Sequence, residues 1–415
     1  MKTEVHQLIP ALRFPEFEGE WEKKKLKDIL EFKNGINASK DDYGFGFKFI
    51  NVLDIIENDF ITHDKIIGKV NVSQEIFEKN LVQYGDILFQ RSSETREEVG
   101  QSNVYLDKGN SATFGGFVIR GRKIGEYDPF FFHLLLKSSI ARKEITSKAG
   151  GSTRYNVGQG ILSSIVLSFA GLPEQQKIAS FLTIIDSRIQ ALEKKKSSLE
   201  QYKKGVMQKI FTQEIRLKDE DGKDFSEWEE KKLGDYILSY RLGGNYKNRD
   251  KITKAPLIKM GNIGRGNIVL KKIQYVNEND TIEQADILKE NDLLFNTRNT
   301  LELVGKVAIW RNELNFALYN SNLMLLKFPN NVFMNYRLNS YEGVKEIKRF
   351  AIGTTSVAAV YTRDLLKLNL KIPPLAEQTH IANFLTALDK KIELVNEQIE
   401  KTKAYKKGLL QKMFV

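Results

Sequence analysis

Four short polar segments carry the side chains best suited to reading or holding nucleic acid. Two of them, Gln90–Arg96 and Asn296–Thr300, follow strand-like runs that end in Phe, and two others, Ser152–Asn156 and Thr354–Ser356, follow a glycine. Arg, Asn, Gln, Ser and Thr hydrogen-bond to base edges in a DNA groove and also hold phosphates. The candidates for such contacts are Arg91, Ser92, Arg96, Thr153, Arg154, Tyr155, Asn156, Thr297, Arg298, Asn299, Thr354, Thr355 and Ser356. The alternative is that these segments are polar loops that solvent tolerates.

Two glycine-containing turns could grip the nucleic-acid backbone. The first is Lys33-Asn34-Gly35, and the second is Arg241–Asn245, which contains two glycines. Basic and amide side chains beside such a turn suit phosphate contact, although turns of this kind are common for structural reasons alone. Lys33, Asn34, Arg241 and Asn245 are therefore weaker candidates.

Catalytic constellations are missing from the sequence. The four histidines are scattered without a metal-ligand spacing, and no G-x-x-x-x-G-K-S/T phosphate loop occurs. The only string near an adenine-methyltransferase motif is Ile372-Pro373-Pro374-Leu375, which lacks the Asp or Asn and the aromatic residue. Glu-x-Lys strings occur, as chance predicts in a chain with 64 basic residues. We therefore expect a non-enzymatic chain without catalytic residues, metal ligands or a cofactor of its own, whose chemistry is recognition.

The polar segments occur in pairs because the whole chain is duplicated. Glu174–Phe211 and Glu377–Phe414 align without a gap at an offset of 203 (377 − 174), and 16 of their 38 positions are identical. Shorter landmarks recur in the same order, among them Trp21 in WEKKKLKD and Trp228 in WEEKKLGD, which we expect to be core residues. Because the scaffold repeats while the polar segments differ, the pattern predicts two related modules that do one job on different targets.

The two repeated segments are predicted to be long helices that pair with each other. Apolar residues recur at alternating steps of four and three over about five heptads in each copy, which is a coiled-coil pattern. The seam residues are Ile178, Leu182, Ile185, Ile189, Leu192, Leu199, Ile381, Leu385, Leu388, Ile392, Val395 and Ile399. An exposed seam needs a partner, and the other copy is the obvious one. We favour antiparallel over parallel pairing, because it gives a two-fold axis that matches the dyads of duplex DNA.

Residues 21–170 and 228–372 are predicted to be mixed α/β modules. Strands are expected at 47–51, 86–90 and 114–119 with a helix at 131–149, and again at 256–260, 292–296, 304–310 and 322–328 with a helix at 335–350. The fold class is therefore α/β (α+β), with two pseudo-two-fold-related globular domains separated by two long helices in an antiparallel coiled coil. The predicted division is 1–172 and 214–374 for the globular domains, and 173–213 and 375–415 for the helices.

Composition favours a soluble globular protein with a polyanionic partner. The chain has 64 Lys and Arg against 53 Asp and Glu, a net charge of +11 and a pI near 9.3. This suits nucleic acid, although solubility alone is an alternative reason for the charge. There is no cysteine, so disulfides and thiolate metal sites are excluded. No apolar run approaches the roughly 20 residues that span a bilayer, and no signal-peptide core is visible. We expect a cytoplasmic, nucleoid-associated protein without a membrane partner.

The combined motifs resemble the specificity subunit of type I restriction–modification enzymes. Two copies of W-x-x-x-x-L, G/N-D-I/L-L-F, V-G and G-S/T-T are each followed by L-P/A-E-Q-x-x-I-A-x-F-L-T-x-x-D and a long helix that ends Y-K-K-G-x-x-Q-K-x-F. The resemblance covers essentially the whole chain, and its specificity lies in the order of the motifs. It implies two target recognition domains that each read one half of a bipartite, asymmetric site in double-stranded DNA. It also implies two antiparallel helices whose length sets the spacer between the half-sites.

The same resemblance implies partners and cofactors on other chains. Two modification subunits would carry S-adenosylmethionine and methylate adenine, and two restriction subunits would add ATP- and Mg-dependent translocation and cleavage. Individual base contacts cannot be carried over, because the recognition domains of this family diverge strongly. Two alternatives stay open. A self-sufficient restriction–methylation enzyme needs motifs that are missing, and a coiled-coil scaffold that does not bind DNA leaves the diverged modules unexplained.

Overall fold

The computed structural model describes residues 8–277 and 279–415, and its packing divides the chain into two compact units. Unit 1 contains the described residues up to Leu192 together with Gln398–Val415, and unit 2 is Glu193–Glu397. Each unit therefore combines one globular module with a stretch of both long helices. Within the described ranges, no helix is long and apolar enough to cross a membrane.

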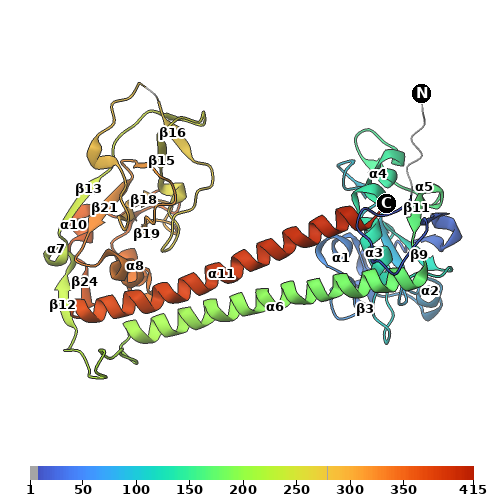
Figure 1. Ribbon diagram of the computed structural model, residues 1–415, viewed down its shortest axis with the longest axis horizontal. Coiled ribbons are helices and arrows are strands. Elements are labelled where there is room, and N and C mark those ends of the chain that lie inside the picture. Colours follow the sequence, from blue (N-terminus) through green and yellow to red (C-terminus); the bar gives the residue numbers. More distant parts are fainter. Residues whose placement is uncertain (1–7, 278) are drawn as a thin grey trace. The chain divides into compact units, whose positions relative to one another are not determined.

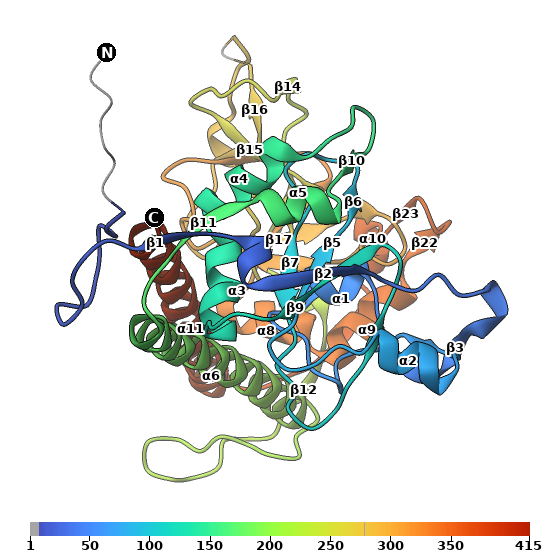
Figure 2. The ribbon, with the colours of Figure 1, turned by 90° about the vertical axis from the view of Figure 1, so that its right-hand side faces the viewer.

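Unit 1 is built on a four-stranded antiparallel sheet in the order β2-β9-β5-β7. Its strands are β2 (Leu30–Asn34), β9 (Val118–Lys123), β5 (Ile87–Gln90) and β7 (Ser102–Val104). Every residue of β5 is buried, because neighbouring strands and packed helices enclose it. In Figure 2, α3 (Pro129–Lys137) and α5 (Gln159–Ser164) lie close to this sheet, where they contact β7 and β2.

Shorter elements complete the module of unit 1. The first and last strands of the module pair antiparallel, and a separate three-stranded sheet has the order β4-β3-β8. These elements are β1 (Glu22–Lys25), β11 (Val166–Phe169), β3 (Tyr43–Ile50), β4 (Lys69–Val70), β8 (Thr113–Phe114), α1 (Val52–Glu57), α2 (Gln74–Lys79), α4 (Ser139–Lys148), η1 (Leu26–Asp28) and η2 (Lys40–Asp42).

Unit 2 repeats this topology. The sheet β13-β21-β17-β19 corresponds to β2-β9-β5-β7, and the pair β12-β24 corresponds to β1-β11. A further sheet of unit 2 has four strands, β14-β16-β15-β20, where its counterpart in unit 1 has three. The elements are β12 (Glu229–Lys232), α7 (Leu233–Tyr236), β13 (Ser239–Leu242), β14 (Asn248–Arg249), β15 (Pro256–Ile258), η3 (Met260–Asn262), β16 (Gln274–Val276), η4 (Gln284–Asp286), β17 (Leu293–Asn296), β19 (Val307–Ile309), β20 (Leu318–Tyr319), β21 (Leu323–Lys327), α8 (Asn331–Asn339), α9 (Tyr341–Arg349), α10 (Thr362–Leu365) and β24 (Asn369–Ile372).

Three predicted elements are wrong in detail. The run 114–119 is not one strand, because β8 ends at Phe114 and β9 begins at Val118. Each predicted helix is in fact two helices, α3 with α4 and α8 with α9. The break falls at Ser138 and Ser340, whose backbones are extended (ψ 154 and 162°) and whose side chains accept from the N–H groups of Ala141 and Gly343. A serine N-cap thus starts a new helix inside an uninterrupted apolar pattern.

In unit 1 the start of α6 (Leu172–Phe211) packs beside the end of α11 (Leu375–Met413), as Figure 1 shows. Ile178 and Leu182 share a hydrophobic core with Leu409 and Met413. Lys406 on α11 donates to Asp186 on α6. The start of one helix therefore lies beside the end of the other, and the antiparallel prediction is confirmed.

Unit 2 shows the reciprocal arrangement. Ile210 and Phe211 at the end of α6 share a core with Ile381 and Leu385 near the start of α11. A Phe at the end of α6 and a Phe just after the end of α11 also contact the opening Trp of a module. Phe211 contacts Trp228 with ring centroids 6.4 Å apart, and in unit 1 Phe414 contacts Trp21 at 6.2 Å. Both Trp side chains are buried, as the sequence predicts for core residues.

Burial along the helices follows the heptad pattern. Leu199 and Ile392 are half-buried. The other ten seam residues are buried: Ile178, Leu182, Ile185, Ile189, Leu192, Ile381, Leu385, Leu388, Val395 and Ile399.

Candidate nucleic-acid interface

The two polar segments of unit 1 meet in the structure. β6 (Ser92–Ser93), from the first segment, pairs antiparallel with β10 (Tyr155–Asn156), from the second, and the two lie side by side in Figure 2. The Ser92 hydroxyl donates to Asn156 Oδ1 at 2.5 Å, and the N–H of Val157 donates to the carbonyl of Arg91 at 2.9 Å. Segments that are 64 residues apart in the chain therefore form one surface.

The corresponding segments of unit 2 also meet. β18 (Arg298–Asn299) pairs with β23 (Ala358–Ala359), which pairs in turn with β22 (Ile352–Gly353). The turn between β22 and β23 exposes Thr354, Thr355 and Ser356, and the N–H of Leu301 donates to the carbonyl of Thr355 at 3.2 Å. The pair β18 with β23 thus corresponds to β6 with β10 but has different residues, and unit 2 adds β22 as a third strand.

Arginines of these surfaces keep most of their donors free. Arg91, Arg96, Arg154 and Arg298 are all exposed. The Arg91 guanidinium makes one long hydrogen bond, 3.5 Å to the carbonyl of Gly116, and the Arg96 guanidinium lies 5.7 Å from the ring centroid of Tyr155. For Arg298 there is no side-chain hydrogen bond or ion pair to any residue in the described ranges. Free guanidinium groups on an exposed surface suit bidentate contact with guanine or phosphate.

Smaller polar residues of the same surfaces support the loops themselves. The Thr297 hydroxyl donates to the carbonyl of Asn322 at 2.9 Å, and Asn299 Oδ1 accepts from the N–H of Thr300. Thr153, by contrast, is exposed. Some of these side chains therefore hydrogen-bond to the loop backbone, and others are free to contact a ligand.

Two of the four weaker candidates have structural partners. Lys33 donates to the carbonyl of Lys79 at 2.6 Å, and burial, followed by the charge of Arg120, lowers the pKa of its ammonium group. Arg241 lies between the carboxylates of Glu283 and Asp286, with an ion pair to each. Asn34 and Asn245 are exposed. The structure thus gives Lys33 and Arg241 a role in holding their turns.

A buried amide opens the first polar segment of each unit, and neither amide was among the residues predicted to contact DNA. Gln90 Oε1 and Asn296 Oδ1 are buried and have no hydrogen-bond partner in the described ranges. Strand register makes them equivalent, because Gln90 pairs with Val118 and Asn296 pairs with Leu323. The same register aligns Arg91 with Thr297 and Ser92 with Arg298. The two segments therefore present their arginines at different places.

A second missed feature joins each module to its long helix. The side chain of Glu174 accepts two hydrogen bonds from Arg13, both 2.8 Å, and Glu377 accepts two from Arg216, 3.3 and 2.8 Å. Trp228 Nε1 also donates to Glu377 at 3.0 Å. Both arginines and both glutamates keep the offset of 203 (216 − 13, 377 − 174), so the Glu of the repeated L-P/A-E-Q motif is a buried anchor for the start of each module.

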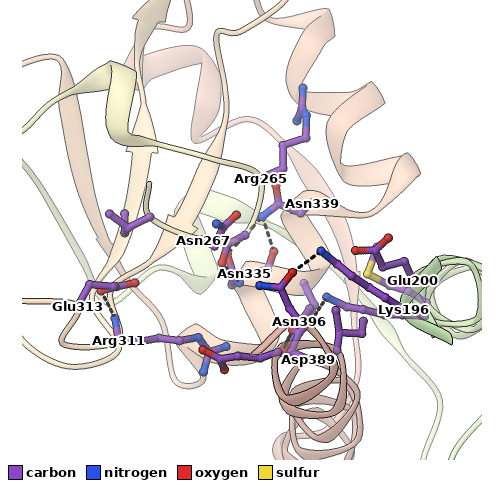
Figure 3. Close-up of a pocket in the computed structure, with 17 residues that line it drawn as sticks. Lys196, Glu200, Arg265, Asn267, Arg311, Glu313, Asn335, Asn339, Asp389 and Asn396 are labelled. Atoms are coloured by element: carbon purple, nitrogen blue, oxygen red, sulfur yellow. Dashed lines mark hydrogen bonds and ion pairs between the residues drawn. The ribbon is translucent and has the colours of Figure 1, made fainter. Parts of the chain in front are cut away.

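Unit 2 contains a cavity of about 940 Å³ between its helices and its module, shown in Figure 3. Lys196 donates to Asn396 across it, and Asn339 contacts Asn335 on its wall. Four basic residues line the cavity, Lys196, Lys203, Arg265 and Arg311, and so do four acidic ones, Glu200, Glu313, Asp389 and Glu393. Since these charges balance, the cavity has no electrostatic preference for phosphate. Over the described ranges, no group of three or more His, Cys, Asp or Glu could hold a metal ion.

Comparisons with known proteins agree with this architecture. The family profile described as "Type I restriction modification DNA specificity domain" matches residues 18–201 and 225–404. The chain is 31% identical over 218 residues to the putative type I restriction enzyme MjaX specificity subunit of Methanocaldococcus jannaschii, a match that covers 50% of each chain. It is 27% identical over 290 residues to the MjaVIII specificity subunit of the same organism, covering 66% of each. The chain thus spans half the length of the first relative and just under two thirds of the second.

Two solved structures share the fold over nearly the whole chain. The type I restriction–modification S subunit from M. genitalium has a TM-score of 0.53 at 15% identity, with 98% of this chain and 99% of that chain covered. A chain from a study of complex assembly and conformational transition in a type I system has a TM-score of 0.57 at 16% identity, with 95% and 96% covered. The fold is that of a duplicated α/β recognition protein with a two-helix coiled coil. The chain belongs to the family of type I restriction–modification specificity subunits.

Proposed function

We propose that this chain reads a bipartite, asymmetric site in double-stranded DNA and directs adenine methylation or cleavage by partner subunits. The observation that carries the proposal is the repeated small sheet, β6 with β10 in unit 1 and β18 with β22 and β23 in unit 2. Each joins two distant polar segments on a common scaffold, and the residues that face solvent differ between the copies. Two equivalent surfaces with different side chains suit two different half-sites.

Charge supports a nucleic-acid partner. The net charge of +11 and the exposed Arg91, Arg96, Arg154 and Arg298 supply the phosphate and base-edge donors that duplex DNA requires. In this proposal the target recognition domains are 1–172 and 214–374, and the helices 173–213 and 375–415 set the spacer between half-sites. Contact with phosphates by Lys33 and Arg241 has the least support in the proposal, because their donors already have partners.

Catalysis belongs to other chains in this proposal. Two modification subunits supply S-adenosylmethionine and the methylating site, into which the target adenine is flipped, and two restriction subunits supply ATP- and Mg-dependent cleavage. The complex acts in the cytoplasm on chromosomal and incoming DNA. A self-sufficient enzyme would need catalytic motifs within these 415 residues, and the sequence has none.

A selection experiment tests the proposal. The full chain is purified with its modification subunits, incubated with S-adenosylmethionine and a library of random duplexes, and the methylated duplexes are sequenced. We expect two defined half-sites separated by a spacer of fixed length and random sequence, with binding that weakens steeply as salt rises. Methylation without sequence preference, or no DNA binding by the complex, would point instead to a scaffold that does not read DNA.

A further inference from the structure

Phe117 is an exposed aromatic residue in a turn. The turn lies within the run 114–119, which was predicted to be a strand. The Phe117 side chain is 66% exposed, and the residue follows Gly115 and Gly116 between β8 and β9. Single exposed apolar residues are common on protein surfaces, so exposure alone assigns no role. The surroundings of Phe117 are what distinguish it.

The turn is held rigidly against the preceding part of unit 1. Gly115 N–H donates to the carbonyl of Ile50 and Gly116 N–H to that of Ile36, both at 2.9 Å. A Cβ at Gly35 would lie 2.1 Å from the carbonyl oxygen of Gly115, so only glycine permits this close approach of the two backbones. The backbone therefore fixes the direction in which Phe117 leaves the surface.

Phe117 is also continuous with the polar surface of unit 1. Its carbonyl accepts from the N–H of Arg91 at 2.9 Å, and the carbonyl of Gly116 accepts from the Arg91 guanidinium at 3.5 Å. A hollow of about 430 Å³ is lined by Phe117 and Arg154, by the carboxylates of Glu94 and Glu98, and by Val52, Gln90, Ser92 and Ser93. An aromatic ring thus lies beside Arg91, Ser92 and Arg154, three of the residues proposed to contact DNA.

Phe117 also lines a second hollow, which has no charged residue. This second hollow, of about 300 Å³, is lined by Tyr43, Phe49, Leu53 and Phe117 together with the amides of Asn37 and Asn51. Because no Lys or Arg lines it, this hollow offers no cation to a phosphate group. The apolar group that DNA displays in its major groove is the 5-methyl of thymine, and Phe is one of the side chains that contact it.

We propose that Phe117 contacts a thymine 5-methyl group in the half-site read by unit 1. This inference rests on the proposed function and makes it more specific. Unit 2 lacks the contact, because Asn322 occupies the equivalent place: its carbonyl accepts from the N–H of Thr297 at 3.1 Å, as the carbonyl of Phe117 accepts from that of Arg91. The two half-sites should therefore differ in their dependence on a thymine methyl.

Replacing thymine by deoxyuridine tests the inference, because it deletes only the methyl group. The complex of full chain and modification subunits is titrated with its selected duplex and with duplexes that carry deoxyuridine at one thymine at a time. We expect one position, in the unit 1 half-site, to lose about 4-fold in affinity, the change that one buried methyl group gives. Phe117→Ala should lose the same factor on the thymine duplex and be insensitive to deoxyuridine there.

Phe45→Ala is the matched control, because Phe45 is also exposed in unit 1 but lines neither hollow. It should keep the wild-type response to deoxyuridine. The inference is overturned if the unit 1 half-site has no thymine, if no deoxyuridine position distinguishes Phe117→Ala from wild type, or if Phe117→Ala weakens all duplexes equally. In each of these cases a wild-type complex that still selects a bipartite site leaves the proposed function standing. If the wild-type complex selects no site, the proposed function fails first.

Discussion

Lys203 on α6 donates to Asp389 on α11 at 2.5 Å, and the counterparts of both residues in the other copy of the repeat, Lys406 and Asp186, form the same pair at the same distance. The offset is 203 in both cases (406 − 203, 389 − 186). Lys203 and Lys406 occupy seam positions, where an apolar residue is the rule. Each Lys has its own Asp on the opposite helix, so the pair marks the register of the antiparallel helices.

Exchanging the charges of Lys203 and Asp389 tests whether this pair sets the register of the helices. Asp389→Lys should destabilise unit 2 by about 1–2 kcal/mol, because it places two cations together and removes an acceptor that Tyr336 also uses at 2.6 Å. The partly exposed pair keeps the effect modest, with 23% and 38% side-chain exposure. Adding Lys203→Asp should restore at least half of the loss in a thermal melt. A double variant no more stable than Asp389→Lys alone would show that the pair does not set the register.

The buried anchor at the start of each module predicts a larger effect. Arg216→Ala leaves the fully buried carboxylate of Glu377 with Trp228 as its remaining partner, and we expect a loss of about 3–5 kcal/mol in the free energy of unfolding. Lys218→Ala is the control, because its 3.8 Å pair with Asp224 is exposed and should contribute under about 0.5 kcal/mol. Urea unfolding measures both. If both variants lose the same free energy of unfolding, the pair of Arg216 and Glu377 does not anchor the module.

His133 predicts a pH dependence of stability in unit 1. The side chain is 3% exposed, and burial, followed by the charges of Lys137 and Lys406, lowers its pKa well below 6.5. Below pH 6.5 the unfolded chain therefore takes up a proton that the folded chain refuses, so stability falls as pH falls. Between pH 7.5 and 5.5 the wild type should lose about 1.4 kcal/mol more than His133→Asn, which copies Asn335 of unit 2. Parallel pH profiles of the two proteins in urea would refute this assignment.

The long helices were predictable because their signal is local. Each heptad pattern, one starting at Ile178 and the other at Ile381, lies within a single continuous segment. The gapless repeat then indicates that the two helices are partners. The strand break at Phe117 was not predictable, because it depends on close approach to Ile36 and Asn37, some 80 residues earlier. The Arg13 and Glu174 anchor was visible as a repeated offset, but nothing in either segment shows that the two touch. The pairing of β6 with β10 joins residues that only the fold brings together.

Helix length gives a prediction about the DNA. One heptad inserted into both helices, after Leu192 and after Glu397, keeps the seam in phase and lengthens each helix by about 10 Å. If the helices set the spacer, the selected half-sites should move apart by about 3 base pairs. Insertion into α6 alone is the control, and it should abolish selection because the two seams no longer match. If the spacer does not change in the doubly extended protein, the helices do not set its length.

The central claim is that each module reads one half-site, and a pair of arginine variants tests it most directly. Arg91→Ala and Arg298→Ala each remove an exposed guanidinium, one from each unit, and the selection from random duplexes is repeated for both. We predict that Arg91→Ala relaxes preference at one half-site only and Arg298→Ala at the other only, by about 1–3 kcal/mol at the affected base pair if each reads a guanine edge. Relaxation of the same half-site by both variants, or a uniform loss on every sequence, would contradict the account.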